Sequence, residues 1–301
     1  MAPSRFSGIG ESVTVLEIIQ RSTDFLAKKG VDSPRLQIEL LLAHALKIPR
    51  LNLYLDFERQ LAETDIEVVR QMVKRRGHRE PLQHITGSTS FCGLEIKVTP
   101  DVLVPRPETE LLAERAWKFL NDRAPAGAEP PSALDFGTGS GCLAVAMAVH
   151  ASAVRIWALD ISEAALEVAL QNAAFHHVSD RIQFVRGDGF DGLCVQPQFD
   201  LIVSNPPYVP SREIEALQPE VRDFDPRLAL DGGADGLEFF RGFAAKAKNF
   251  LRPAGKLMLE FGDGQEAKLQ KLLVENAWLV EAVGRDYSGR PRILVAQPGG
   301  S

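Results

Sequence analysis

The stretch Asp135-Phe136-Gly137-Thr138-Gly139-Ser140-Gly141 decides the fold. A short apolar run at residues 133–136 leads into it, and an apolar run typical of a helix follows it. Glycines in such a loop let the backbone turn sharply and approach a ligand closely. In open α/β sheets, ligands bind at the carboxyl edge of the strands, which is where this loop would lie. We therefore predict a ligand-binding loop after the first strand of a parallel sheet.

The sequence on both sides of this loop shows how the sheet is built. Runs rich in β-forming residues alternate with helical runs, which predicts a parallel sheet covered on both faces. The last two β-forming runs, at residues 279–285 and 292–296, are too close for a parallel crossover and must be antiparallel. We predict an α/β fold with a Rossmann-like seven-stranded sheet and an antiparallel terminal hairpin, the shape of class I S-adenosylmethionine-dependent methyltransferases. The other expected strands are residues 155–159, 182–186, 199–204 and 256–261.

The N-terminal part of the chain has a different pattern. Apolar residues recur at helical spacing from Val15 onward, Ser33-Pro34 is typical of a helix start, and a third helix is expected from Glu63. These features predict a small helical bundle over residues 1–80. Short β-prone runs separated by glycines, among them Ile85-Thr86-Gly87, then predict a β-hairpin linker. We expect the linker to cover residues 81–104 and the catalytic domain to cover residues 105–301.

Composition narrows the class of protein. A length of 301 residues suits two domains, and a net charge of −6 argues against a broad nucleic-acid-binding surface. No apolar run reaches the length of a membrane span. The cysteines, Cys92, Cys142 and Cys194, are far apart and lack metal-ligand spacing, so we expect neither disulfides nor a metal site. A reducing compartment and a cytoplasmic location are expected, with a weak organelle-targeting role left open.

The glycine pattern distinguishes two cofactors. A dinucleotide loop follows GxGxxG, and Cys142 stands where its third glycine would be. Asp135 would repel an anionic pyrophosphate but attract the sulfonium and ammonium groups of S-adenosylmethionine. The loop therefore predicts S-adenosylmethionine as the cofactor and disfavours an NAD-dependent oxidoreductase.

Two further acidic residues follow the next strands. Asp160 ends the second strand, where a carboxylate binds ribose hydroxyls; the alternative is a helix N-cap. Asp188 follows the third strand and is expected to accept a hydrogen bond from the adenine amino group, while the Gly189 amide faces the ring. The alternative for Asp188 is a turn residue.

The motif Asn205-Pro206-Pro207-Tyr208 carries the predicted chemistry. Its prolines lack backbone donors, so the carbonyls of Asn205 and Pro206 and the Asn205 side chain are free to accept hydrogen bonds. A planar NH2 group has two donors that match such acceptors, and Tyr208 supplies a flat face for stacking. The motif therefore predicts methylation of an amide or amino nitrogen without a strong general base. The alternative is a Pro-Pro loop that ends a strand.

Together these residues resemble the HemK/PrmC family of protein N5-glutamine methyltransferases over nearly the whole chain. The most specific part is Leu103-Val104-Pro105-Arg106-Pro107-Glu108-Thr109-Glu110 combined with the N-terminal helices. Leu230-Asp231-Gly232-Gly233-Ala234-Asp235-Gly236-Leu237 also looks like the family pattern, as does the spacing of Asp286, Gly289 and Arg292. Two departures are Gly189, where many relatives carry a bulky residue, and Asp225-Pro226, where Glu-Pro is usual.

The resemblance implies a substrate and a set of contacts. The family methylates the glutamine of the Gly-Gly-Gln tripeptide in peptide chain release factors, and the N-terminal helices would dock a second part of that protein. Arg106 and Glu108 would lie near the mouth of the site, and Glu260 is a weaker candidate whose role could equally be structural. The implied cofactor contacts are the loop Gly137–Gly141, Asp160, Asp188 and Asn205, and the implied glutamine contacts are Asn205, Pro206, Pro207 and Tyr208.

Other functions remain open at this point. A sister enzyme that methylates a glutamine of a large-subunit ribosomal protein would share the cofactor site and the catalytic motif. A DNA or RNA adenine N6-methyltransferase also uses such a motif, but it would need a basic surface, which the net charge of −6 disfavours. A non-catalytic S-adenosylmethionine-binding module is disfavoured by the intact Asn205 motif.

Overall fold

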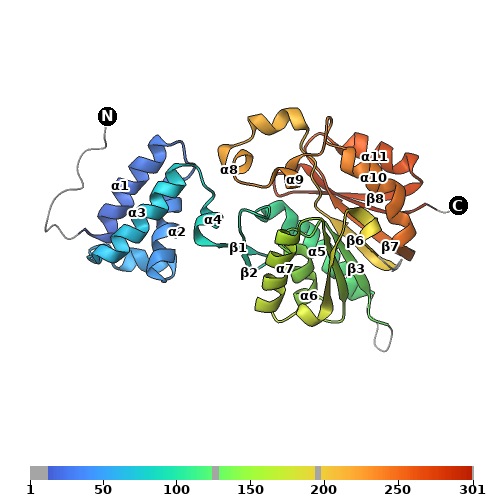
Figure 1. Ribbon diagram of the computed structural model, residues 1–301, viewed down its shortest axis with the longest axis horizontal. Coiled ribbons are helices and arrows are strands. Elements are labelled where there is room, and N and C mark those ends of the chain that lie inside the picture. Colours follow the sequence, from blue (N-terminus) through green and yellow to red (C-terminus); the bar gives the residue numbers. More distant parts are fainter. Residues whose placement is uncertain (1–12, 124–128, 194–197, 300–301) are drawn as a thin grey trace. The chain divides into compact units, whose positions relative to one another are not determined.

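The computed structural model describes residues 13–123, 129–193 and 198–299. The chain divides into two compact units, Met1–Thr86 and Gly87–Ser301 (Figure 1). The finer division at residues 80 and 104 stays a prediction, and the hairpin belongs to the second unit.

The first unit is helical. Its first helix begins with a capping box, in which the Thr14 hydroxyl accepts from the Glu17 amide at 3.3 Å and the Glu17 carboxylate accepts from the Thr14 amide at 3.0 Å. Ile19, Leu41 and Val69 belong to one shared core. The elements are α1 (Val15–Lys28), α2 (Pro34–Leu46), η1 (Arg50–Leu55), α3 (Glu63–Gly77) and α4 (Leu82–Thr86).

One expectation for this region was wrong. The run Ile85-Thr86-Gly87 was expected to be β-prone, but residues 82–86 form α4. The Ile85 amide donates to the Pro81 carbonyl at 3.2 Å, and the Thr86 hydroxyl donates to the Leu82 carbonyl at 3.1 Å. Ile85 is buried in the helical core, and this burial outweighs the intrinsic β preference of Ile and Thr. The antiparallel hairpin follows as β1 (Ser88–Phe91) and β2 (Leu94–Lys97).

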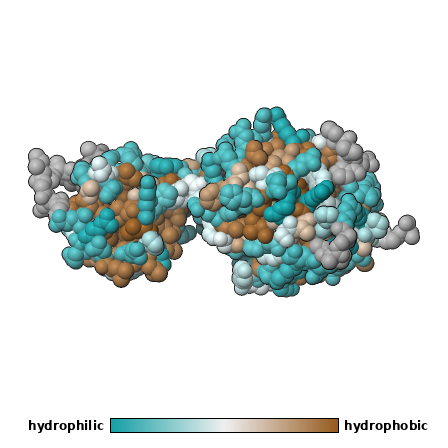
Figure 2. Space-filling view, turned by 90° about the horizontal axis from the view of Figure 1, so that it is seen from below, coloured by the Kyte–Doolittle hydropathy of each residue, from teal (hydrophilic) through white to brown (hydrophobic). Residues whose placement is uncertain are grey.

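Large apolar side chains also reach the surface of the helical unit. Figure 2 shows hydrophobic residues gathered on the visible face of this unit. Leu51 and Leu55 of η1 are 69% and 84% exposed, and Tyr54 lies between them in sequence. Contiguous exposed apolar patches are typical of surfaces that bind another macromolecule.

The second unit is built on one seven-stranded sheet with the order β5-β4-β3-β6-β7-β9-β8. The first five strands of this order are parallel, and β9 is antiparallel to both β7 and β8. The predicted α/β fold with its terminal hairpin is therefore confirmed. The strands are β3 (Ser132–Phe136), β4 (Arg155–Asp160), β5 (Ile182–Arg186), β6 (Phe199–Ser204), β7 (Leu251–Glu260), β8 (Trp278–Arg285) and β9 (Pro291–Pro298).

Helices cover both faces of this sheet (Figure 1). One face is covered by α5 (Pro107–Asp122), α6 (Cys142–His150) and α7 (Glu163–Phe175), and the other by α10 (Glu238–Lys246) and α11 (Glu266–Glu275). The chain runs from β3 outward to β5 and then returns to β6 on the other side of β3. Such a reversal of strand order leaves a crevice at the carboxyl edge, between the loops after β3 and β6. The short elements are η2 (Ser179–Arg181), η3 (Gly189–Gly192), η4 (Ser211–Ala216), α8 (Pro219–Arg222), α9 (Arg227–Leu230) and η5 (Ala247–Phe250).

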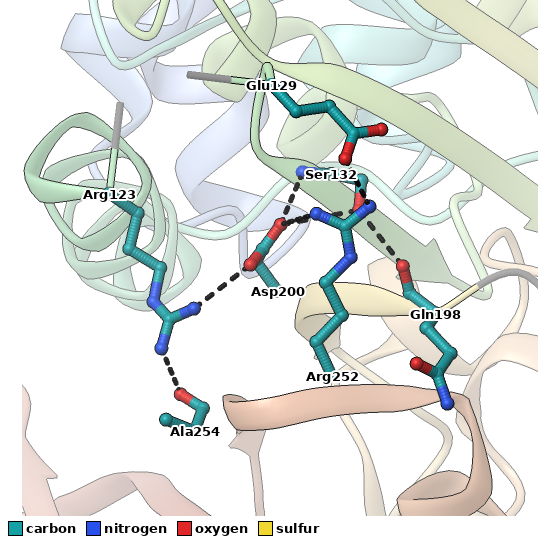
Figure 3. Close-up of polar contacts among 7 residues, drawn as sticks. All are labelled: Arg123, Glu129, Ser132, Gln198, Asp200, Arg252 and Ala254. Atoms are coloured by element: carbon teal, nitrogen blue, oxygen red, sulfur yellow. Dashed lines mark hydrogen bonds and ion pairs between the residues drawn. The ribbon is translucent and has the colours of Figure 1, made fainter. Parts of the chain in front are cut away.

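The amino edge of the sheet is held by a buried carboxylate (Figure 3). Asp200 accepts from the Ser132 amide at 2.9 Å, from Arg123 at 3.0 Å and from Arg252 at 3.3 Å. Arg123 also donates to the Ala254 carbonyl. These contacts connect the beginnings of β3, β6 and β7 to the end of α5.

Candidate active site

Two cavities meet at the carboxyl edge of the sheet. The first has a volume of about 290 Å³, and we call it the glycine-loop cavity because residues 137–140 line it. The second has a volume of about 300 Å³, and we call it the tyrosine cavity because Tyr208 lines it. Both are lined by Asn205 and Pro206, together with Leu103 and Ala229. The start of the Asn205-Pro206-Pro207-Tyr208 motif therefore borders both compartments.

The glycines of the loop serve two geometric purposes. Gly137, Gly139 and Gly141 have φ angles of 73°, 53° and 78°, a region that other residues rarely adopt. A Cβ atom at Gly137 or Gly139 would meet no atom within 4 Å, so the space in front of the loop is open. A Cβ atom at Gly141 would lie 2.8 Å from the Ala169 Cβ, so this glycine allows α6 and α7 to pack closely.

Asp135 lies at the end of β3 and is fully buried. Its Oδ2 accepts from the Thr138 hydroxyl at 2.6 Å and from the Ala144 amide at 3.1 Å, while Oδ1 has no partner among the described residues. Burial, aided by the charge of Asp160, raises the pKa of Asp135 to about 7. Unlike the loop residues that follow it, Asp135 does not line the glycine-loop cavity, so it can influence a ligand there through its charge but not by direct contact with the cavity.

Asp160 ties the loop to the second strand. One oxygen of its carboxylate accepts from the Gly139 amide at 2.8 Å and the other from the Ser162 amide at 2.9 Å. The N-cap of α7 is Ser162, whose hydroxyl accepts from the Ala165 amide, so Asp160 is not the helix cap. Each oxygen of Asp160 keeps a second lone pair, and the residue lines the glycine-loop cavity.

The far end of this cavity is formed by residues 187–189. Asp188 is exposed, and Gly189 has a φ of 72° with open space where a Cβ atom would stand. The structure thus brings both predicted residues to the same cavity as the glycine loop.

Tyr208 is held through its backbone and its side chain. Its carbonyl accepts from the side-chain nitrogen Nε2 of Gln265 at 2.8 Å. A Cβ atom at Gly232 would come within 2.8 Å of the Tyr208 Cα, and one at Gly236 within 2.4 Å of the Tyr208 carbonyl oxygen. The glycines of residues 230–237 are therefore needed for close approach to Tyr208.

A buried hydrogen-bond chain connects the motif to β7. Oε2 of Glu260 accepts from the Thr109 hydroxyl at 2.7 Å, and Oε1 accepts from the Tyr208 hydroxyl at 3.2 Å. The Asn205 amide nitrogen donates to the Thr109 oxygen at 3.0 Å. Burial raises the pKa of Glu260 to about 7, and the pKa of Tyr208 also rises because it is buried beside Glu260.

Arg106 and Glu108 both line the tyrosine cavity. Arg106 also forms an ion pair with Asp225, a buried residue of the segment between α8 and α9. Burial raises the pKa of Asp225 while Arg106 lowers it, and Oδ1 of Asp225 has no partner within the described part of the chain. Arg106 therefore fastens the α8–α9 segment to the start of α5 as well as lining the cavity.

Sequence reasoning did not find all residues of the site. Thr109 lies inside the family-like stretch Leu103–Glu110, yet no spacing argument links it to Asn205 or Glu260. No motif in the sequence singles out Gln265, yet its side-chain amide donates to the Tyr208 carbonyl. Arg292 lines the tyrosine cavity and pairs with Asp286 at 3.1 Å, which gives a structural reason for the Asp286–Arg292 spacing.

The thiols and carboxylates do not gather into a metal centre within the described ranges. These ranges contain no group of three or more His, Cys, Asp or Glu side chains that could hold a metal ion. Cys92 and Cys142 are free thiols, and Cys194 lies outside the described residues. In the same part of the chain, no helix is long and apolar enough to cross a membrane.

The comparisons with known proteins follow the same division into two units. Residues 118–221 match the methyltransferase small domain family, and residues 17–87 match the PrmC N-terminal domain family. The hMettl16 catalytic domain, solved in complex with the MAT2A 3′UTR hairpin 6, shares the fold with a TM-score of 0.51. It is 18% identical, and the match covers 68% of this chain and 76% of that one. Fold and site thus define a class I methyltransferase.

Two curated relatives narrow the class. The release factor glutamine methyltransferase of Geobacter sulfurreducens is 41% identical over 281 residues, which cover 93% of this chain and 95% of the relative. That of Chlorobaculum tepidum is 42% identical over 284 residues, with coverages of 93% and 96%. The chain belongs to the family of release factor glutamine methyltransferases.

Proposed function

We propose that this protein methylates N5 of the glutamine in the Gly-Gly-Gln motif of peptide chain release factors, with S-adenosylmethionine as the methyl donor. The observation that carries the proposal is that the two cavities share Asn205 and Pro206. A cofactor in the glycine-loop cavity and a glutamine side chain in the tyrosine cavity would meet at these residues.

The residues of the glycine-loop cavity fit this cofactor. Asp135 is fully buried and does not line the cavity, but its neighbours Phe136 and Gly137 do, so its charge would act on a positively charged ligand through the loop. The open space before Gly137 and Gly139 admits a group close to the backbone, and the remaining lone pairs of Asp160 suit ribose hydroxyls. Asp188 and Gly189 would hold the adenine. When bound, S-adenosylmethionine supplies a methyl group on a positively charged sulfur that leaves as a neutral thioether.

The protein's part in the reaction is to hold the acceptor nitrogen. Asn205 and the carbonyl of Pro206 would accept the two hydrogens of the glutamine NH2 group, while the Tyr208 ring packs against the amide plane. The nitrogen is thereby aimed at the methyl carbon, and orienting two reactants in this way contributes roughly 7–11 kcal/mol. One N–H proton leaves to solvent as the new N–C bond forms.

The proposed substrate is a protein, and the helical unit supports this. Residues 17–87 match the PrmC N-terminal domain family, and the exposed Leu51 and Leu55 of that unit offer apolar contact area. We propose that the unit docks a second part of the release factor. The net charge of −6 disfavours stable nucleic-acid binding. The proposal also places the protein in the cytoplasm, with its substrate.

Mass spectrometry of methyl transfer tests the substrate. The acceptors are a purified release factor, a large ribosomal subunit and unmethylated double-stranded DNA. We expect one added methyl group on the Gly-Gly-Gln glutamine and none when that glutamine is replaced by alanine. Transfer to the ribosome or the DNA instead of the release factor would overturn the proposed substrate.

Asn205→Ala tests the catalytic motif. We expect methyl transfer to fall by about 1,000-fold or more, because both the in-line orientation and an acceptor of the NH2 group are lost. Cofactor binding, followed by calorimetry, should weaken but persist. Asn121→Ala is the matched control, since Asn121 is exposed on α5 and donates to the His150 carbonyl away from both cavities. Full activity of Asn205→Ala would contradict the assigned role.

A further inference from the structure

We infer that Glu260 and Thr109 are positioning residues that fix the orientation of the Asn205 side chain, so that its oxygen faces the acceptor nitrogen. The inference rests on the proposed function, because it concerns how the glutamine NH2 group is held. Neither residue is among the catalytic-motif residues that the sequence predicted.

Glu260 is buried among hydroxyl groups. Its side chain is 1% exposed, and within the described part of the chain it has no ion pair. It is bonded to the hydroxyls of Thr109 and Tyr208, and the charges of Glu108 and Arg292 also act on it. An ionised carboxylate can only accept hydrogen bonds, so both hydroxyls must direct their hydrogens to Glu260.

The Thr109 hydroxyl lies between Glu260 and Asn205. This residue is 2% exposed, and its hydroxyl has a single hydrogen, which the 2.7 Å contact to Glu260 consumes. Only oxygen lone pairs then remain to face Asn205 at 3.0 Å. Asn205 must therefore present its NH2 group to Thr109, because two oxygens without a hydrogen between them would repel each other.

The orientation of the Asn205 carboxamide decides which of its atoms meets the substrate. With its nitrogen bound to Thr109, the Asn205 carboxamide directs Oδ1 away from α5, and Asn205 borders both cavities. An oxygen accepts from the glutamine NH2 group, whereas the reverse orientation would place one NH2 group against another. The chain Glu260–Thr109–Asn205 thus sets which end of Asn205 meets the substrate.

The same chain predicts how protonation acts. A protonated Glu260 can donate to Thr109, which then turns its own hydrogen toward Asn205 and permits the reversed carboxamide. Because the pKa of Glu260 is raised to about 7, kcat should fall as the pH decreases through this value. Asp135 has a similar pKa but lies at the glycine loop, and saturating S-adenosylmethionine suppresses its effect on cofactor binding.

The experiment compares Thr109→Val, Thr109→Ser and the wild type. Valine keeps the shape of threonine without the hydroxyl, so we expect kcat to fall roughly 10- to 100-fold, the equivalent of one misplaced hydrogen bond. The KM for S-adenosylmethionine should change less than about 3-fold, since valine keeps the shape of Thr109 where it lines the glycine-loop cavity. Serine restores the hydroxyl and should recover most of kcat.

The pH profile separates positioning from a merely structural role. The wild type and Thr109→Ser should lose kcat below pH about 7, while Thr109→Val should be nearly independent of pH there, because the link between Glu260 and Asn205 is broken. Wild-type kcat in Thr109→Val, or an unchanged acidic limb, would overturn the inference. If Thr109→Val does not fold by thermal unfolding, Glu260→Gln replaces it, with the acidic limb expected to disappear.

These outcomes are distinct from failure of the proposed function. If the wild type does not methylate a release factor, the substrate is wrong, and the same variants are then compared on whichever acceptor the mass spectrometry identifies. If the wild type methylates the release factor and Thr109→Val does so equally fast, only the positioning role fails.

Discussion

The two edges of the catalytic sheet treat buried carboxylates differently. At the amino edge, Asp200 is surrounded by Arg123, Arg252 and a backbone amide (Figure 3). At the carboxyl edge, Glu260 is more deeply buried, and its hydrogen bonds within the described ranges come from two hydroxyl groups, at 2.7 and 3.2 Å. Asp135 is also a buried carboxylate without an arginine or lysine partner among the described residues, and one of its oxygens has no hydrogen bond there.

The difference shows which edge is built for stability. A buried carboxylate with cationic partners is compensated within the protein, whereas one without them carries an unfavourable free energy of burial. The raised pKa values of Asp135 and Glu260 express that cost. Carboxylates of this kind gather at functional sites, because a ligand or a substrate group completes their interactions. We therefore expect the carboxyl edge, and not the amino edge, to bind the cofactor and the substrate.

The largest effect is expected from breaking the amino edge with Asp200→Ala. This change leaves two arginines and the Ser132 amide without their shared acceptor, so the free energy of unfolding should fall by about 3–5 kcal/mol. Urea denaturation measures the loss. The kcat of the folded protein at low temperature should stay near the wild-type value, because Asp200 lies at the opposite edge from both cavities. A large drop in kcat with normal stability would contradict the comparison.

At the carboxyl edge, the contribution of Glu260 to stability should depend on pH. The pKa of Glu260 is raised by burial from its ordinary value of 4.5 to about 7, so the ionised group destabilises the fold above pH 7. This destabilisation is relieved as the pH falls through 7 toward 4.5. Glu260→Gln should therefore be more stable than the wild type at high pH, by up to about 3 kcal/mol, and the gap should close at low pH.

Urea denaturation at about pH 8 and pH 5 measures this gap. Asp135→Asn provides a second test of the same sign, since its pKa is also raised to about 7. An equal stability difference at both pH values would show that the carboxylate of Glu260 does not carry the cost.

The strand positions follow closely from the sequence because each core strand is a short apolar run between turn residues. The run at residues 199–204 coincides with β6, and the run at 182–186 coincides with β5. The start of α5 was less predictable. Apolar periodicity begins only at Leu111, whereas the helix begins at Pro107. The first turn carries polar residues and therefore shows no apolar period in the sequence. The four-residue helices α8 and α9 are too short to show a helical period.

The motif residues of the site were predictable, but their connections were not. The glycine loop and Asn205–Tyr208 are contiguous in sequence, so local chemistry indicates them. Thr109 is 96 residues from Asn205 and 151 residues from Glu260, and no local pattern encodes contacts at that separation. The hydroxyl-only environment of Glu260 is likewise a property that arises when the chain folds.

The smallest effect on stability is expected at the Arg106–Asp225 pair, which combines an arginine partner with a place near the carboxyl edge. Asp225 is a buried carboxylate of the second unit that lies near the carboxyl-edge site, yet it has an arginine partner in Arg106. Arg106→Gln should lower the free energy of unfolding by only about 1 kcal/mol, because glutamine keeps a side-chain donor for the buried Asp225 carboxylate and the Arg106 side chain is 34% exposed. Arg186→Gln, in an ion pair exposed on both sides, is the matched control and should change stability less.

Arg106→Gln should also change the binding of the substrate. Without the ion pair, helices α8 and α9, which carry Val221 and Leu230 of the tyrosine cavity, are held less firmly. We expect the KM for the release factor to rise several-fold, roughly the effect of about 1 kcal/mol, with kcat at saturation nearly retained. Steady-state kinetics on the Gly-Gly-Gln acceptor measures both constants. A fall in kcat with unchanged KM would instead place Arg106 among the groups that act on the reacting amide, and the Arg106–Asp225 pair would then belong with Glu260 rather than with Asp200.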